Sequence, residues 1–360
     1  MPGKPTAAFL PDLTFSNPFP SSAQAGPPAN PLVYMADRNL LNSVMQQWTF
    51  TLEQQLHENW AVRATYVGAQ THHALYYAGE INKPSVQQPN VPLQAQRPYQ
   101  PWGQINRTHT DGKMNLDQLQ LELNRRFAAG LLIQAEYSFT RSLDNVPLVG
   151  GVQNPYDQNA DYGNTDSVPR HILVVNYLYE LPFGEHRRFN IHNRVLDGIA
   201  GGWSVSGITR YQTGTPFSLA FTVPSNIIGW WGGRPDTVAG ADLYAGQQSG
   251  HDIVKGVQWF NPAAFAPPQP WQYGNSSRNM LFGPGFWNYD IGVQKTFRIT
   301  EAHLIQIRGD GLNAFNHFNL GNPNATIADT RDGGLPNPNA GRIQSGSGSR
   351  IIQVGLKYIF

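Results

Sequence analysis

Residues 350–360, at the C-terminus of the chain, alternate apolar and polar side chains and end on an aromatic residue. Successive side chains of a β-strand point to opposite faces, so one face would carry only apolar residues. These residues are Ile352, Val354, Leu356, Tyr358 and Phe360. A bilayer requires such a strand, about ten residues long, with lipid on one side and a polar lumen on the other. The ending therefore predicts a transmembrane β-strand.

The same alternation recurs along the chain, and it predicts about nine strands joined as antiparallel neighbours. The clearest hairpin pairs residues 118–124 with residues 133–139 through a turn at Ala128, Ala129 and Gly130. Strands are also predicted near residues 48–52, 60–66, 171–181, 203–211, 287–293, 303–312 and 352–360. Residues 31–36 could supply a tenth strand, and closure of a bacterial barrel needs an even number.

Short and long connections alternate between these strands. Residues 69–114, 142–169, 215–286 and 316–349 form long stretches rich in Gly, Pro and Asn, whereas the intervening turns are shorter. Outer-membrane barrels show this asymmetry, with short periplasmic turns and long external loops. If the C-terminus lies in the periplasm, every short turn falls on that side.

The predicted fold is therefore an all-β, antiparallel up-and-down transmembrane β-barrel, here a partial barrel of about nine to ten strands with long external loops. Residues 46–360 would form the barrel region, and residues 1–45 an extended or loop segment left from a missing upstream part. The polar face of the clearest hairpin would line the lumen. Its residues are Gln118, Gln120, Glu122, Asn124, Gln134 and Glu136.

The composition agrees with this prediction and excludes other classes. Charged residues make up only 14% of the chain, and Lys and Arg (25) balance Asp and Glu (24), so no basic field would attract nucleic acid. The chain has no cysteine, which excludes thiolate metal sites. Residues 1–30 lack the charged leader and apolar segment of a signal peptide, so we expect the C-terminal piece of a longer exported protein or a misplaced start.

A set of short motifs spread from Gln46 to the C-terminus resembles the barrel of Oar-like TonB-dependent receptors. The motifs are Gln46-Gln47-Trp48, Tyr66-Val67-Gly68, Asn124-Arg125-Arg126-Phe127 with Gly130, Pro169-Arg170-His171, Leu181-Pro182-Phe183-Gly184, Gly202-Trp203, Gly214-Thr215-Pro216-Phe217, Trp259-Phe260-Asn261 with Ala264-Phe265, Gly283-Pro284-Gly285, Asn288-Tyr289-Asp290 and residues 312–319. The ending likewise resembles the last strand of such barrels, whose terminal Phe the barrel-assembly machinery reads.

The resemblance implies a location in the bacterial outer membrane, with membrane lipid and the barrel-assembly machinery as partners. It implies uptake or surface binding of a large substrate. The TonB complex would be a partner only through N-terminal parts that have no counterpart here, because nothing in this sequence resembles a plug or a TonB box. Gly309-Asp310-Gly311 also departs from the family, whose members more often show a carboxylate followed by aromatics.

The sequence gives no support for an enzyme, a cofactor or a metal. Neighbouring His72 and His73 would point apart on a strand and so would not share a metal. Asp157, Asp161 and Asp166 lack EF-hand spacing, so we interpret these aspartates as solvated turn residues. The aromatic-rich loops could bind a ligand through Trp230, Trp231, Trp259 and Trp271. An alternative of another class is a secreted soluble β-sandwich that binds carbohydrate through these loops, because sandwich strands alternate in the same way.

Overall fold

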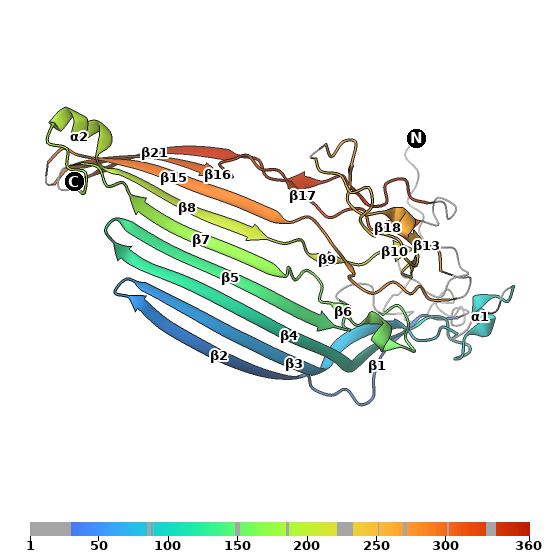
Figure 1. Cartoon of the computed structure of the whole chain (residues 1–360). Helices are drawn as coiled ribbons and strands as arrows, with labels where there is room; N and C mark the ends of the chain where they lie inside the picture. Colours follow the sequence, from blue (N-terminus) through green and yellow to red (C-terminus); the bar gives the residue numbers. More distant parts are fainter. Residues whose placement is uncertain are drawn as a thin grey trace, which may run out of the picture.

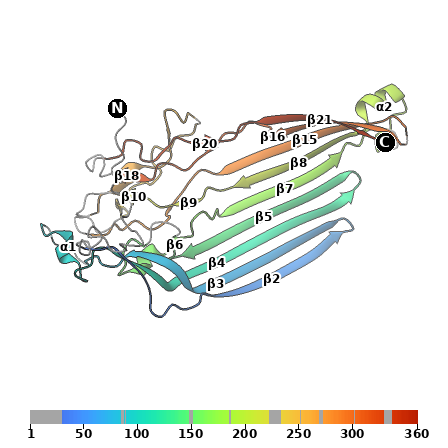
Figure 2. The ribbon, with the colours of Figure 1, turned by 180° about the vertical axis from the view of Figure 1, so that it is seen from behind.

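One large curved sheet dominates the computed structural model (Figures 1 and 2). The structure describes residues 30–84, 88, 90–147, 152–184, 187–221, 233–250, 252–268, 272–300, 302–328 and 336–360. The main path of the sheet follows the order β2-β3-β4-β5-β7-β8-β15-β16-β21, so each strand pairs with the next one along the chain. All these pairings are antiparallel. This is the predicted up-and-down order.

The nine strands of this path match the nine segments expected from the alternation. They are β2 (Val44–His57), β3 (Trp60–Glu80), β4 (Ile105–Ala128), β5 (Leu131–Asp144), β7 (His171–Glu180), β8 (Trp203–Gln212), β15 (Phe286–Arg298), β16 (Leu304–Leu312) and β21 (Ile351–Ile359). Two further strands join the sheet outside this path, β1 (Val33–Ala36) and β6 (Gly163–Asn164).

The tight turns lie at one end of the sheet, together with the C-terminus (Figure 1). Between β4 and β5, Ala129 (φ 48°) and Gly130 (φ 79°) both adopt positive φ. Positive φ at both central residues is the geometry of a two-residue type I′ hairpin, whose twist matches that of the flanking strands. Helix α2 (Arg194–Ala200) occupies the longer connection between β7 and β8 at the same end. The predicted separation of short and long connections is confirmed.

The second strand and the third strand of the path continue well beyond the predicted boundaries. β3 runs to Glu80 and β4 starts at Ile105, so much of the expected loop 69–114 is a strand pair interrupted by bulges. This extension lacks the regular apolar alternation from which the strands were predicted. Residues 31–36 do not supply a tenth spanning strand, since β1 pairs in parallel with the outer part of β4.

The long connections β8–β15 and β16–β21 fold together at the other end, and we call their described parts the loop cluster. Short strand pairs hold it: β9 (Pro216–Phe217) with β14 (Leu281–Phe282), β10 (Ala220–Phe221) with β18 (Thr326–Ala328), β11 (Asp236–Thr237) with β13 (Phe265–Ala266), β12 (Val257–Gln258) with β19 (Arg342–Ile343), and β17 (Asn319–Leu320) with β20 (Gly346–Ser347). Helix α1 (Leu93–Gln96) and the 3₁₀ turns η1 (Gln158–Asp161) and η2 (Pro262–Ala264) complete the described elements.

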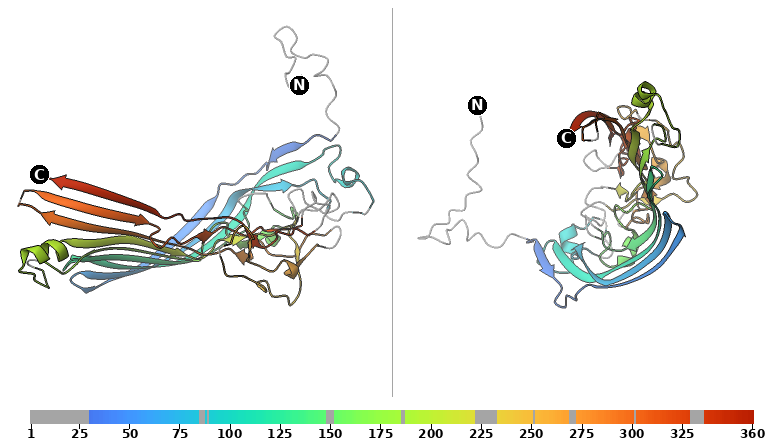
Figure 3. Two further views of the ribbon diagram at one scale, coloured as in Figure 1. Left: turned by 90° about the horizontal axis from the view of Figure 1, so that it is seen from above. Right: turned by 90° about the vertical axis from the view of Figure 1, so that its left-hand side faces the viewer.

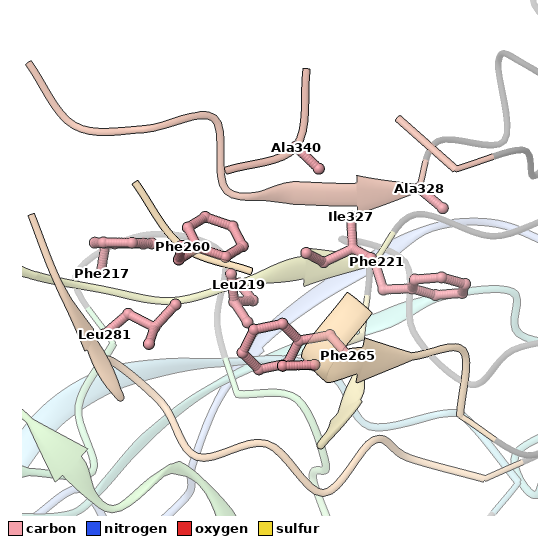
Figure 4. Close-up of a cluster of buried hydrophobic side chains, with 10 residues drawn as sticks. Phe217, Leu219, Phe221, Phe260, Phe265, Leu281, Ile327, Ala328 and Ala340 are labelled. Carbon is pink, nitrogen blue, oxygen red and sulfur yellow. The ribbon is translucent and has the colours of Figure 1, made fainter. Parts of the chain in front are cut away.

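The loop cluster has its own hydrophobic core (Figure 4). Phe260 and Leu281 are fully buried there, and Phe260 meets Phe265 edge to face with ring centroids 5.9 Å apart. Ile327 and Ala340, from the β16–β21 connection, close the same core. The two loops are therefore one packed unit.

The sheet curves but does not close on itself (Figure 3). β2 and β21 form its two edges, and the described strands do not join them. Within the described chain, no helix is both long and apolar enough to cross a bilayer.

Candidate functional site: the two faces of the sheet and the loop cluster

The strand register places like residues in line across the sheet. Phe50 pairs with Tyr66, Tyr66 with Leu119, and Leu119 with Phe139. Directly paired residues of antiparallel strands point to the same side of a sheet. This row therefore belongs to one apolar face, which also carries Leu52, Leu121, Leu173 and Trp287 along with many equivalent positions.

The apolar face is exposed. Leu52 is 62% exposed, Leu121 is 42% exposed and Leu356 is 75% exposed. The two faces of a soluble sandwich bury such rows against each other. The β-sandwich alternative is therefore wrong, because the described residues provide no second layer over this face.

The opposite face is polar, and it carries all six residues predicted to line the lumen. Gln118 pairs with Thr140, Gln120 with Ser138, Glu122 with Glu136 and Asn124 with Gln134. Arg63 lies between two carboxylates on this face, with its guanidinium 3.0 Å from Glu53 and 3.1 Å from Glu122. Further along, Arg308 contacts Asp310 at 2.8 Å. Polar side chains of this face thus pair both across neighbouring strands and along single strands.

Aromatic side chains mark the two ends of the apolar face. Trp48, Tyr66, Phe139, Tyr211 and Trp287 lie toward the loop cluster, whereas Trp60, Trp203, Phe297, Tyr358 and Phe360 lie toward the tight turns. In β15 the distance from Trp287 to Phe297 is roughly 33 Å of extended chain. With a strand tilt of about 40°, this length projects to roughly 25 Å along the barrel axis, which is the height of the apolar band of an outer-membrane barrel. Tyr137 and Tyr289, on the same face, lie nearer its middle.

The terminal strand places its five predicted residues as expected on the apolar face. Ile352 pairs with Gly311, Val354 with Gly309 and Leu356 with Ile307. The ring of Tyr358 stacks on His303, and its hydroxyl lies 2.7 Å from Nδ1 of that histidine. Phe360 is 89% exposed and stacks on Tyr358 at 5.7 Å. The chain thus ends on an accessible aromatic residue beside the edge of the sheet.

Two arginines of the loop cluster tie it to the end of β5 and to the β5–β7 connection. Arg278 contacts Asp144, and it also contacts Asp166 at 3.1 Å. Arg234 contacts Asp161 at 2.5 Å. Asp161 is buried, so its interpretation as a solvated turn residue is wrong. Burial of a carboxylate requires a paired charge or hydrogen bonds, and Arg234 supplies them.

The predicted ligand-binding residues are only partly covered by the structure. Trp259 donates its Nε1 hydrogen to the carbonyl oxygen of Phe282 at 2.7 Å, which anchors one loop strand to another. Trp230, Trp231 and Trp271 lie outside the described residues. His72 lies in the β2–β3 ladder opposite Val44, and His73 adopts a positive φ at a bulge. The described residues contain no group of three or more His, Cys, Asp or Glu that could hold a metal ion.

A buried lysine lies near two tyrosines, between the end of β3 and the β5–β7 connection. Burial lowers the pKa of the Lys83 ammonium to about 8, because a charge is poorly solvated there. The Tyr156 hydroxyl donates to the Lys83 carbonyl oxygen. Burial raises the pKa of both Tyr156 and Tyr273 for the same reason, so their neutral forms are favoured. The Tyr273 hydroxyl has no hydrogen-bond partner among the described residues.

A family model described as an outer membrane beta barrel domain matches residues 3–353. The chain belongs to this family. It is thus an outer-membrane protein of bacteria, and the predicted fold class and location are confirmed. No curated protein matches it.

Several solved structures are similar at low identity. The outer membrane transporter YddB from Escherichia coli is 12% identical, with a TM-score of 0.44, over 92% of this chain and 34% of that protein. BauA, the ferric preacinetobactin receptor from Acinetobacter baumannii, is 11% identical, with a TM-score of 0.42, over 88% of this chain and 29% of that protein. The FrpB iron transporter from Neisseria meningitidis is 10% identical, with a TM-score of 0.40, over 91% of this chain and 32% of that protein. This outer-membrane barrel chain spans about a third of their length.

Proposed function

We propose that the sheet spans the outer membrane with its apolar face in lipid and its polar face on an aqueous interior. The observation that carries this proposal is the strand register, which aligns apolar with apolar and polar with polar residues across the path. The exposed Leu121 is costly in water but favourable in hydrocarbon. Its neighbour Gln120 bonds the polar side chain of Gln118 at 2.6 Å on the other face.

Cysteine labelling tests this assignment, and the absence of native cysteine makes each label unique. Leu121→Cys and Gln120→Cys are compared in isolated outer membranes with a small, water-soluble maleimide. We expect Gln120→Cys to react through the aqueous interior and Leu121→Cys to stay protected until detergent replaces the lipid. Equal reaction of both cysteines in intact membranes would disprove the assigned faces.

We further propose that the chain is the C-terminal barrel part of an Oar-like TonB-dependent receptor or transporter. The motifs spread from Gln46 to residues 312–319 support this subtype. Its role would be uptake or surface binding of a large substrate, without catalysis, and TonB would act through N-terminal parts of the receptor. The test is uptake of labelled peptides and oligosaccharides by cells with and without the intact receptor. Unchanged uptake and surface binding of both substrate classes would contradict the proposal.

The terminal strand is proposed as the segment that the barrel-assembly machinery binds. Phe360 is accessible at the end of β21, beside an edge that no described strand covers. Phe360→Ala should slow membrane insertion in cells, whereas Ile351→Ala, on the other face of β21, should not. Equal insertion rates of Phe360→Ala and the unchanged protein would contradict this role.

A further inference from the structure

The connection between β7 and β8 differs from the tight turns at the same end of the sheet. It carries helix α2, which projects beyond the outer side of the curved sheet (Figure 3). Asn193 caps the helix, because its side-chain oxygen accepts hydrogen bonds from the amides of Val195 at 2.9 Å and Leu196 at 3.2 Å. The helix is therefore a formed element.

The C-terminal end of α2 is attached to the apolar face of the sheet. Trp203 donates its Nε1 hydrogen to the Ile199 carbonyl oxygen at 2.8 Å. Lys295, which pairs with Trp203 in the ladder, donates to the carbonyl oxygens of Ile199 and Gly201. The Lys295 ammonium also lies 4.9 Å from the ring centroid of Phe297. The charge of Lys295, on this mainly apolar face, is thus partly compensated by the carbonyl oxygens at the helix end.

The free side of α2 is apolar and uncovered. Val195 is 71% exposed and Ile199 is 66% exposed, and Leu196 is also exposed. Residues three and four apart lie on the same side of a helix, so these side chains form one patch. Nearby Phe183 and Phe189 stack on each other at 5.3 Å and are exposed as well. The patch continues the apolar face at the level of Trp203.

Exposed basic side chains surround this patch. Arg188 and Arg194 are exposed, and the Arg188 guanidinium lies 5.9 Å from the Phe189 ring centroid. Arg187 is held by Glu180 at 2.8 Å. Apolar residues beside arginines are typical of helices that lie in a membrane interface, where the apolar side enters the acyl chains and the cations meet phosphate.

We propose that α2 is a membrane-surface helix that binds anionic phospholipid of the periplasmic leaflet. Val195, Leu196 and Ile199 enter the upper acyl chains, and Arg188 and Arg194 contact headgroup phosphates. The proposal rests on the proposed function, since it requires the apolar face to lie in lipid. It adds a second contact surface, which would fix the height of the barrel in the bilayer.

Depth-dependent fluorescence quenching tests the position of α2. Single variants Ile199→Cys, Leu121→Cys and Val254→Cys of the full chain carry the same fluorophore in vesicles of phosphatidylethanolamine and phosphatidylglycerol. Brominated phosphatidylcholine, with bromine either shallow or deep in the acyl chain, is the quencher. We expect shallow bromine to quench the Ile199 label most and deep bromine the Leu121 label. The Val254 label, in the outer loop cluster at 90% exposure, should respond only to aqueous iodide.

The three labels separate failure of this inference from failure of the proposed function. A quenched Leu121 label with an Ile199 label that responds only to iodide would overturn the α2 inference and leave the transmembrane sheet intact. An Ile199 label protected from both bromine and iodide would overturn it too, because a protein would then cover the patch. A Leu121 label that responds only to iodide would overturn the proposed function itself.

The charge contribution is tested with brominated phosphatidylglycerol against brominated phosphatidylcholine. At the Ile199 label, the anionic lipid should be preferred, and Arg188→Gln with Arg194→Gln should lower this preference by roughly five-fold per arginine. Arg350→Gln, at the other end of the sheet, is the matched control and should leave the preference unchanged. An equal preference before and after loss of both arginines would overturn the anionic-lipid contact.

Discussion

The sheet and the loop cluster use the same apolar side chains in opposite ways. Phe50 on the sheet is 61% exposed, whereas Phe260 in the loop cluster is 0% exposed. The loop cluster buries its rings around a core, as a protein does in water, and the sheet presents its rings outward. The difference supports the proposal that the two regions face different solvents, with water around the loops and hydrocarbon around the sheet.

Truncation of a ring in each region should give the sharpest contrast. Phe260→Ala leaves a cavity in a fully buried core, so we expect a loss of about 3–5 kcal/mol in the stability of the loop cluster. Hydrogen exchange of the Trp259 amide, which bonds the Gly341 carbonyl oxygen, measures this loss. Phe50→Ala is the matched control and should leave that amide unchanged. Equal effects of both variants would remove the distinction between the regions.

Removal of one buried arginine should affect the loop cluster almost as much. Arg278→Gln leaves Asp144 buried without its cation, so we expect a loss of roughly 3–5 kcal/mol. Arg308→Gln is the matched control, because its pair with Asp310 is largely exposed and should contribute no more than about 1 kcal/mol. The measurement is proteolysis of the loop cluster in intact outer membranes. Similar cleavage rates for the two variants would contradict the structural role of Arg278.

A charge placed on either side of one strand tests the sheet. Leu121→Arg should destabilise the protein by about 2–4 kcal/mol, because it brings a cation to the middle of the hydrocarbon. Gln120→Arg should be tolerated on the wet face. Urea-dependent folding into lipid vesicles gives both free energies, and equal tolerance would reverse the conclusion drawn from the exposed leucines.

The smallest effect concerns pH and is confined to the outer loops. In the unfolded chain Lys83 keeps its ordinary pKa of 10.5, whereas burial lowers it to about 8. Between these values the unfolded chain binds more protons, so stability should rise with pH, by up to about 3 kcal/mol in total. Lys83→Met should be more stable at neutral pH and lose this rise. Hydrogen exchange from about pH 7 to pH 9.5 measures this stability and avoids tyrosine ionisation. The same dependence of stability on pH in the unchanged protein and in Lys83→Met would contradict the burial effect.

The sequence predicts the sheet much better than it predicts the loop cluster. Leu119 and Leu121 alternate with Gln118 and Gln120 because one face is apolar and the other polar, and that pattern is local. The contact of Arg278 with Asp144 joins residues 134 positions apart, and no local spacing predicts it. Helix α2 was missed as well, although Asn193 before Val195 and Ile199 is a recognisable start.

The core of the loop cluster also orders events during assembly. Ile327 and Ala340 come from the connection that precedes β21, and they pack on Phe217 and Phe260 from the connection that precedes β15. The outer surface therefore reaches its final form only after translation of the last connection. Without Ile327 and Ala340 this core would stay incomplete, so the outer surface becomes compact only when the last two connections have met.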